Sequence, residues 1–194
     1  MSDLPSSVAR LEKADLALGR RMAGERHEPA VKAAAKAGKL GDQEPLYLIS
    51  AGVAAAGLLS RRPRLFMAGV RMGAAVAAAD LIKSLVKRGV TRTRPHVLLD
   101  EGRYERDLGG AEDKPEQSFP SGHMACTTAA ACALARAFPA TWPAGLVAAL
   151  GLGWSRIKKG AHWPLDVAAG AVIGLVAEPL SALAIALLKS PWRR

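Results

Sequence analysis

The sequence predicts an all-α integral membrane helical bundle of about five transmembrane helices, preceded by a polar or interfacial amino-terminal helix. Half of the 194 residues are hydrophobic but only 5% are aromatic, and the apolar residues gather in runs instead of alternating with polar ones. Runs rich in Ala and Leu, with little β-branched alternation, are typical of helices rather than strands. The five runs are Leu46–Ser60, Leu65–Ile82, Met124–Phe138, Trp142–Trp154 and Leu165–Leu188.

The segment Ser6–Leu40 differs from these runs because its few leucines and valines are scattered among charged side chains. We expect one polar helix that lies at the membrane interface or in solvent. A Gly-Asp pair and Pro45 are expected to end it before the first apolar run. The chain therefore divides into an amino-terminal segment over residues 1–44 and a helical membrane domain over residues 45–194.

Membrane insertion competes with one alternative, a soluble bundle with an apolar core. A bilayer core of ~30 Å requires about 20 apolar residues in a helix, whereas three of the five runs contain only 13–15, and Arg71, Asp80 and Glu178 interrupt the longer ones. The membrane is favoured because five helices of this apolarity leave little polar surface. Ala and Gly also suit close helix packing in lipid, and basic clusters such as Arg61–Arg64 flank the runs.

The formal net charge of +10 does not indicate a nucleic-acid-binding protein. The basic residues are divided among short connectors, with no recognition helix and no set of aromatic side chains for stacking on bases. Cys126 and Cys132 both lie in one apolar run, which disfavours a disulfide scaffold and a Cys-based zinc site. The basic excess therefore flanks membrane helices or binds a small anionic substrate.

A first chemical cluster lies where the second long run meets the longest connector, residues 88–119. Connectors of this length without their own periodicity are usually functional or disordered. Lys87 closes the preceding helix, and Arg94 follows seven residues later with Pro95 keeping the chain extended.

A second cluster opens the third run. Ser121 suits the N-cap of a helix, and Gly122 allows a ligand to approach the backbone closely. The free N–H groups of a helix start favour an anion. His123 lies in the first turn, where it can donate a proton to a bound group.

The third cluster joins the last two runs. Ser155 and Arg156 are followed by His162, and Pro164 suits the first position of the last helix. Asp166 is then four residues from His162, within reach of the imidazole ring. A carboxylate there would select the tautomer of His162 and support a developing positive charge.

Each cluster alone has a plain structural explanation: a basic flank, an ordinary helix cap and a structural His–Asp hydrogen bond. Together they converge on one end of the bundle if the helices alternate in direction. Lys and Arg side chains there would bind phosphate oxygens, one histidine would act as a nucleophile and the other as an acid. No Asp, Glu or His set has the spacing of a metal site, so we expect phosphoryl transfer without a metal.

The three clusters resemble the signature of the type 2 phosphatidic-acid phosphatases, relatives of bacterial acid phosphatases and vanadium haloperoxidases. That signature reads K-x6-RP, PSGH and SR-x5-H-x3-D, and the resemblance covers about residues 45–190 of the chain. Every fixed position is matched. The matching residues are Lys87, Arg94, Pro95, Pro120, Ser121, Gly122, His123, Ser155, Arg156, His162 and Asp166.

The resemblance implies a role for each of these residues and no cofactor. His162 would attack phosphorus to form a phosphohistidine, Asp166 would orient it, and His123 would protonate the departing alcohol. The groups expected to bind the phosphate oxygens are Lys87, Arg94, Arg156, Ser121 and the Gly122 amide. Lys158 and Lys159 depart from the usual pattern and would bind a second phosphate or an anionic head group, or remain solvated.

The expected substrate is a lipid phosphate: phosphatidic acid, phosphatidylglycerophosphate, or a polyprenyl phosphate or diphosphate, with the isoprenoid lipids favoured. The expected location is a bacterial inner membrane. Because basic residues concentrate at the end that carries the three clusters, the positive-inside rule places the site on the cytoplasmic side. The Ala-rich helix faces suit packing within one chain or between chains alike, so the sequence does not determine the oligomeric state.

Two other function classes compete with a lipid phosphatase. A vanadate-dependent haloperoxidase-like enzyme would hold vanadate in the same anion pocket, but such enzymes are larger and soluble. A non-catalytic membrane scaffold would have little reason to keep both histidines and Asp166 at these spacings.

Overall fold

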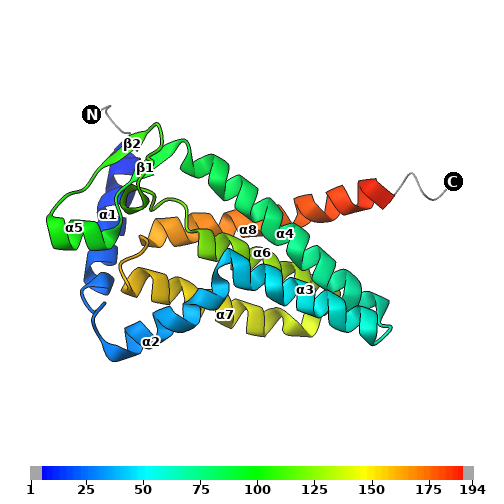
Figure 1. The fold of residues 1–194 in the computed structure, drawn as a ribbon. Helices are drawn as coiled ribbons and strands as arrows, with labels where there is room; N and C mark the ends of the chain where they lie inside the picture. Colours follow the sequence, from blue (N-terminus) through cyan, green and yellow to red (C-terminus); the bar gives the residue numbers. More distant parts are fainter. Residues whose placement is uncertain (1–5, 190–194) are drawn as a thin grey trace.

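The computed structural model describes residues 6–189 and is built mainly of helices (Figure 1). Five helices, α3, α4, α6, α7 and α8, form an elongated bundle, while α1, α5 and the β1–β2 hairpin lie at one end of it. The helices are α1 (Ser6–Ala23), α2 (Pro29–Ala37), α3 (Gln43–Leu59), α4 (Pro63–Lys87), α5 (Pro95–Glu101), α6 (Gly122–Ala137), α7 (Trp142–Lys158) and α8 (Pro164–Lys189). The shorter elements are η1 (Gly38–Gly41), β1 (Val90–Arg92), β2 (Arg106–Leu108), η2 (Lys114–Glu116) and η3 (Pro139–Thr141).

All five apolar runs are helical, which confirms the helical prediction for α3, α4, α6, α7 and α8. Two of them, Pro63–Lys87 and Pro164–Leu188, are long and apolar enough to cross a membrane. Helices α3, α6 and α7 contain 16 or 17 residues each. These two helices are therefore candidate spans by length and composition, and the prediction of five spans stays a prediction.

The long helices direct their apolar side chains outward. Only 22% of the most apolar 18-residue stretch of α8 is buried, and 33% of that of α4. Leu180, Leu183 and Leu187 on α8 are each more than half exposed. A core helix of a soluble protein would be mostly buried, so this surface favours membrane insertion over the soluble bundle.

The interior of the bundle is made of small side chains. Ala75 and Ala79 of α4 and Ala125, Ala129 and Ala133 of α6 are almost completely buried. Helix α8 comes close to the start of α6 at Gly170, where a Cβ atom would lie 2.4 Å from the carbonyl oxygen of Ser121. Small residues let helix backbones approach in this way. This contact places the second turn of α8 beside the first turn of α6.

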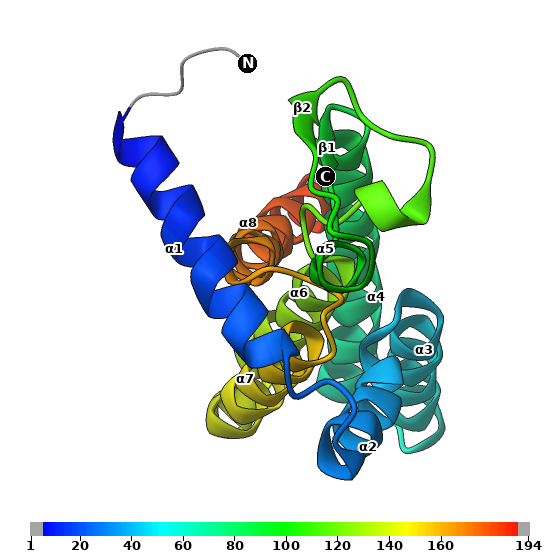
Figure 2. The same cartoon turned by 90° about the vertical axis from the view of Figure 1, so that its left-hand side faces the viewer.

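The amino-terminal segment corrects the prediction of a single helix. It forms α1 and α2, separated by a turn at Gly24–Glu28, and then η1. Pro45 lies in the first turn of α3, where a missing N–H costs nothing, and so does not end the preceding segment. Helix α1 crosses the end of the bundle and contacts α5, α7 and α8 (Figure 2).

The connector 88–119 is ordered. Its strands β1 and β2 pair antiparallel, with Thr91 opposite Asp107, and α5 lies between them in the chain. The amide of Ser118 donates to the carbonyl oxygen of Arg92 at 2.9 Å, so the end of the connector returns to its beginning. The connector therefore forms a cap at the end of the bundle that carries the three clusters.

We predict that Gly69→Ala lowers the stability of the bundle. A Cβ atom at Gly69 of α4 would lie 2.3 Å from the backbone nitrogen of Ala54 of α3, and overpacking of this kind costs about 1–3 kcal/mol. The matched control is Gly52→Ala on α3, where a Cβ atom meets nothing within 4 Å. Thermal unfolding in detergent should show a lower Tm for the first variant only; equal Tm values would contradict the close packing.

Candidate active site

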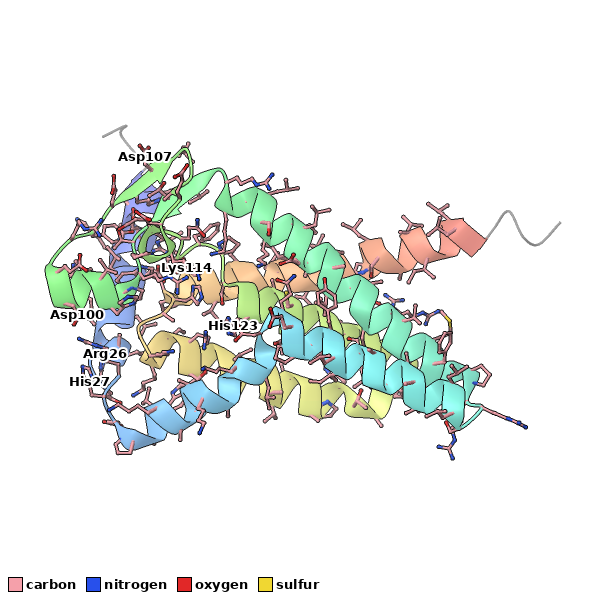
Figure 3. All side chains as sticks on the ribbon, in the orientation of Figure 1. Arg26, His27, Asp100, Asp107, Lys114 and His123 are labelled. Carbon is pink, nitrogen blue, oxygen red and sulfur yellow. The ribbon has the colours of Figure 1, made fainter. Side chains whose placement is uncertain are left out.

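The three sequence clusters meet at the capped end of the bundle. Lys87 ends α4, Arg94 immediately precedes α5, and Ser121 precedes α6. Arg156 lies in the last turn of α7, His162 in the connector that follows, and Asp166 in the first turn of α8. Figure 3 shows His123 toward this end of the bundle, with Lys114 in the cap and Asp100 at the outer edge of the cap.

His162 is buried, and its hydrogen-bond partner differs from the expected one. Its Nδ1 lies 2.7 Å from the carbonyl oxygen of Ser118, whereas Nδ1 and Asp166 Oδ2 are 3.9 Å apart. The longer distance is beyond hydrogen-bond range. Because a carbonyl oxygen can only accept, Nδ1 must carry the proton, which leaves the lone pair on Nε2. The predicted direct His162–Asp166 hydrogen bond is therefore replaced by one to the backbone.

Ser118 links Asp166 to His162 by two hydrogen bonds. The Ser118 hydroxyl donates to Asp166 Oδ2 at 2.5 Å while the Ser118 carbonyl accepts from His162. The backbone N–H of Trp163 donates to the same carboxylate oxygen at 2.8 Å. The other oxygen, Oδ1, accepts from Arg92 Nη1 at 2.5 Å. All of these donors hold the carboxylate of Asp166, which has no exposed surface, in one orientation.

His123 contacts two charged groups. Nη2 of Arg156 lies 2.9 Å from Nε2 of His123. The carboxylate of Asp42, in the connector between η1 and α3, also lies against this ring nitrogen and forms an ion pair with it when the imidazole is protonated. A positive and a negative group thus meet at the histidine expected to move a proton.

Ser121 occupies the N-cap position of α6, but its side chain does not cap the helix. The hydroxyl is completely buried and has no hydrogen-bond partner among residues 6–189, and the same is true of Arg156 Nε. The backbone N–H of Ser121 donates instead to the carbonyl oxygen of Asp166 at 2.9 Å. Ser121 thus takes the N-cap position expected from the sequence without a side-chain cap, and two polar atoms beside His123 remain available to a ligand.

The cations of the first cluster are held by the cap. Lys87 Nζ donates to the carbonyl oxygen of Gln117 at 2.6 Å, and Arg94 Nε donates to that of Lys114 at 2.9 Å. Burial lowers the pKa of His162 well below its ordinary value, and the positive charges of Arg94 and Lys87 lower it further. His162 is therefore neutral at physiological pH, the form in which imidazole is a nucleophile.

Lys158 does not face the site. It pairs with Glu25 of the turn before α2 and lies 5.7 Å from the centre of the Trp154 ring. Lys159 is exposed overall. The part of its side chain that is buried lowers its pKa, and the positive charge of Arg156 lowers that pKa further. Within residues 6–189, no three His, Cys, Asp or Glu side chains are grouped so that they could hold a metal ion.

Four residues of this arrangement were not expected from the sequence: Asp15, Asp42, Arg92 and Ser118. Arg92 lies inside the first cluster, but nothing in its spacing distinguishes it from its basic neighbours. Ser118 contributes a carbonyl group, which every residue possesses. Asp15 and Asp42 come from the amino-terminal segment, far in sequence from the groups that they contact. No pattern in the sequence could have identified these four.

Known proteins resemble this chain in both sequence and fold. The lipid A 1-phosphatase of Rhizobium johnstonii is 35% identical over 111 residues, which are 57% of this chain and 45% of that protein. The decaprenylphosphoryl-5-phosphoribose phosphatase of Mycobacterium tuberculosis is 41% identical over 129 residues, 66% of this chain and 65% of that protein. The chain thus matches between about half and two thirds of the length of these relatives.

The crystal structure of the first transmembrane PAP2 type phosphatidylglycerolphosphate phosphatase from Bacillus subtilis shares the fold. The TM-score is 0.65 at 20% identity, over 89% of this chain and 85% of that one. Residues 68–188, well over half of the chain, match the model of the PAP2 superfamily. That range contains all three clusters, from Lys87 to Asp166, and on this evidence the chain belongs to the PAP2 superfamily.

Proposed function

We propose that this protein is a membrane phosphatase that hydrolyses a lipid phosphate through a phosphohistidine on His162, without a metal ion. The observation that carries the proposal is the state of His162: neutral, with its proton on Nδ1 and its Nε2 lone pair available, among three cationic side chains. The names of the relatives, which are phosphatases, support the reaction class.

A phosphate would satisfy the groups that the protein leaves without partners. The Ser121 hydroxyl and Arg156 Nε are buried and unpaired among the described residues, and an unpaired buried polar group costs about 1–3 kcal/mol. The N-terminus of α6 adds the Gly122 amide and the positive end of the helix dipole. Lys87 at the end of α4 and Arg94 in the cap supply further positive charge. These groups converge beside His123 and His162.

The reaction follows in two balanced steps. Nε2 of His162 attacks phosphorus, the P–O bond to the alcohol breaks, and the leaving oxygen takes a proton from His123. Water then attacks the phosphohistidine, His123 takes a proton from that water, and phosphate leaves with His162 restored. The Asp166 carboxylate stabilises the positive ring formed by the attack, since it lies 3.9 Å from Nδ1.

A lipid substrate suits the position of the site. Helices α4 and α8 direct apolar side chains outward, and the site lies at their shared end. A head-group phosphate can reach it while the tail stays in the bilayer. We favour an isoprenoid-lipid phosphate, because the mycobacterial relative at 41% identity is named for a decaprenyl-linked phosphate. A bacterial inner membrane and a cytoplasm-facing site complete the proposal, the latter from the distribution of basic residues.

The first test measures phosphate release by detergent-purified protein in the presence of EDTA. The panel contains phosphatidic acid, phosphatidylglycerophosphate, and a polyprenyl monophosphate and diphosphate. Release should survive EDTA and fall at least about 10³-fold in His162→Ala, because the nucleophile is lost. His27→Ala is the matched control, since His27 is exposed in the turn between α1 and α2. Substantial turnover by His162→Ala would refute the phosphohistidine mechanism.

A second prediction concerns the acid. His123→Ala should lower kcat/KM for an alkyl phosphate by about 10²-fold or more, but should affect p-nitrophenyl phosphate much less, because nitrophenolate departs without a proton. The ratio of the two kcat/KM values isolates the first chemical step from hydrolysis of the intermediate. Equal losses for both substrates would remove His123 from the acid role.

A third prediction follows from the burial of His162. NMR of histidine-labelled protein, with His162→Ala for assignment, should show this imidazole staying neutral as the pH falls through about 6.5, the ordinary imidazole pKa. The sign follows from burial and from the neighbouring cations, both of which disfavour the charged form. Protonation of His162 at or above that pH would contradict the buried, cation-lined site.

A further inference from the structure

The amino-terminal helix α1 lies outside residues 68–188, the part of the chain that matches the family, yet it reaches the catalytic groups. Figure 2 shows it crossing the end of the bundle in front of α7 and α8. Its Asp15 is only 5% exposed. The carboxylate accepts from Arg92 Nη2 at 2.5 Å and from the backbone N–H of Leu165, at the start of α8, at 2.8 Å. A buried charge with two such partners is held firmly.

Arg92 joins Asp15 to Asp166. Its Nη1 donates to Asp166 and its Nη2 to Asp15, both at 2.5 Å. Arg92 is 5% exposed, and its guanidinium carbon lies 5.6 Å from the centre of the Trp163 ring. Because the guanidinium is planar and its donors are fixed, a carboxylate on one side determines how it meets the carboxylate on the other.

We propose that Asp15 is a positioning residue for phosphoryl transfer, acting through Arg92 to hold Asp166 and, by way of Ser118, the imidazole of His162. This inference rests on the proposed function of His162 as the nucleophile. It assigns to α1 a part in the reaction, in place of the solvated or interfacial helix that its composition predicts.

The charges explain what the link does. Asp15, Arg92 and Asp166 together carry a net charge of −1. In Asp15→Asn the net charge is zero, and Arg92 pairs with Asp166 alone. The electrostatic potential at His162 then becomes less negative, so the positively charged imidazole formed by its attack on phosphorus is less stable. The phosphate-binding cations are untouched, so kcat should fall about 10- to 100-fold with little change in KM.

The same reasoning determines the effect on the titration of His162. The charged groups that face its ring from the packed elements are Lys87 of α4, Arg94 before α5, Arg156 of α7 and Asp166 of α8, with Arg92 of β1 and Asp15 of α1 behind Asp166. Removing one negative charge from this set disfavours the protonated imidazole. The NMR titration of His162 should therefore move to lower pH in Asp15→Asn.

The matched control is Glu12→Gln. Glu12 lies one turn earlier on α1 and binds Tyr104 at 2.7 Å and Arg106 at 2.5 Å, so it also docks α1 on the connector. It does not contact Asp166, and its link to Arg92 runs through the Tyr104 hydroxyl, to which Arg92 Nε donates at a long 3.4 Å. Asp15→Asn should lower kcat and move the His162 titration, whereas Glu12→Gln should leave both within about twofold or within error. Equal effects of the two variants would show that Asp15 serves only to dock the helix, and would overturn the proposal.

A double-mutant cycle tests the path through Arg92. If Asp15 acts through this residue, Asp15→Asn should lose most of its effect on kcat in an Arg92→Gln background and keep only the through-space effect of its charge, and fully additive losses would overturn the link. Should Asp15→Asn fail to fold, Arg92→Lys tests the same link. Lysine keeps the positive charge but lacks the two parallel N–H donors with which the guanidinium binds both carboxylates. An unchanged kcat and an unchanged His162 titration in this variant would refute the link. A wild-type protein inactive on every substrate would overturn the proposed function, while the His162 titration, which needs no turnover, would still decide the role of Asp15.

Discussion

The burial of one carboxylate organises this protein. Asp166 has no exposed surface, and a buried charge is tolerated only when it is paired and hydrogen-bonded. Its donors come from β1, from the end of the connector and from the residue before α8. Because each donor lies on a different segment, satisfying this one group brings those segments together. The cap, the last helix and the amino-terminal helix are all positioned by that requirement.

Small residues allow the helices that carry the site to pack closely. The core between α4, α6 and α8 is largely alanine, and α8 approaches α6 so closely at Gly170 that no side chain fits. The second turn of α8 then lies beside the first turn of α6, which brings the N-terminus of α6 next to His162. In lipid, where water does not drive helices together, close backbone packing is a principal source of association. The apolar body of the molecule thus determines the geometry of its polar end.

The two histidines are supported differently, in keeping with different tasks. His162 is buried, donates from Nδ1 to a backbone carbonyl and is surrounded by cations, which keeps it neutral, as the proposed attack on phosphate requires. His123 contacts a cation, Arg156, and a carboxylate, Asp42, so both signs of charge touch the ring to which the proposed mechanism assigns proton transfer. Carboxylates from the amino-terminal segment lie behind both: Asp42 directly, and Asp15 by way of Arg92.

The sequence by itself determined the five bundle helices and the three clusters, because helix periodicity and motif spacing are local properties. It did not determine that residues 6–40 form two helices or that the connector forms an ordered cap. The four-residue spacing also predicted a contact between Asp166 and the His162 ring. In the structure Nδ1 of His162 instead donates a hydrogen bond to the carbonyl oxygen of Ser118. A backbone carbonyl has no signature in a sequence. Asp15 and Asp42 were decided by tertiary structure alone, because their contacts join segments that only the packing of the whole bundle brings together.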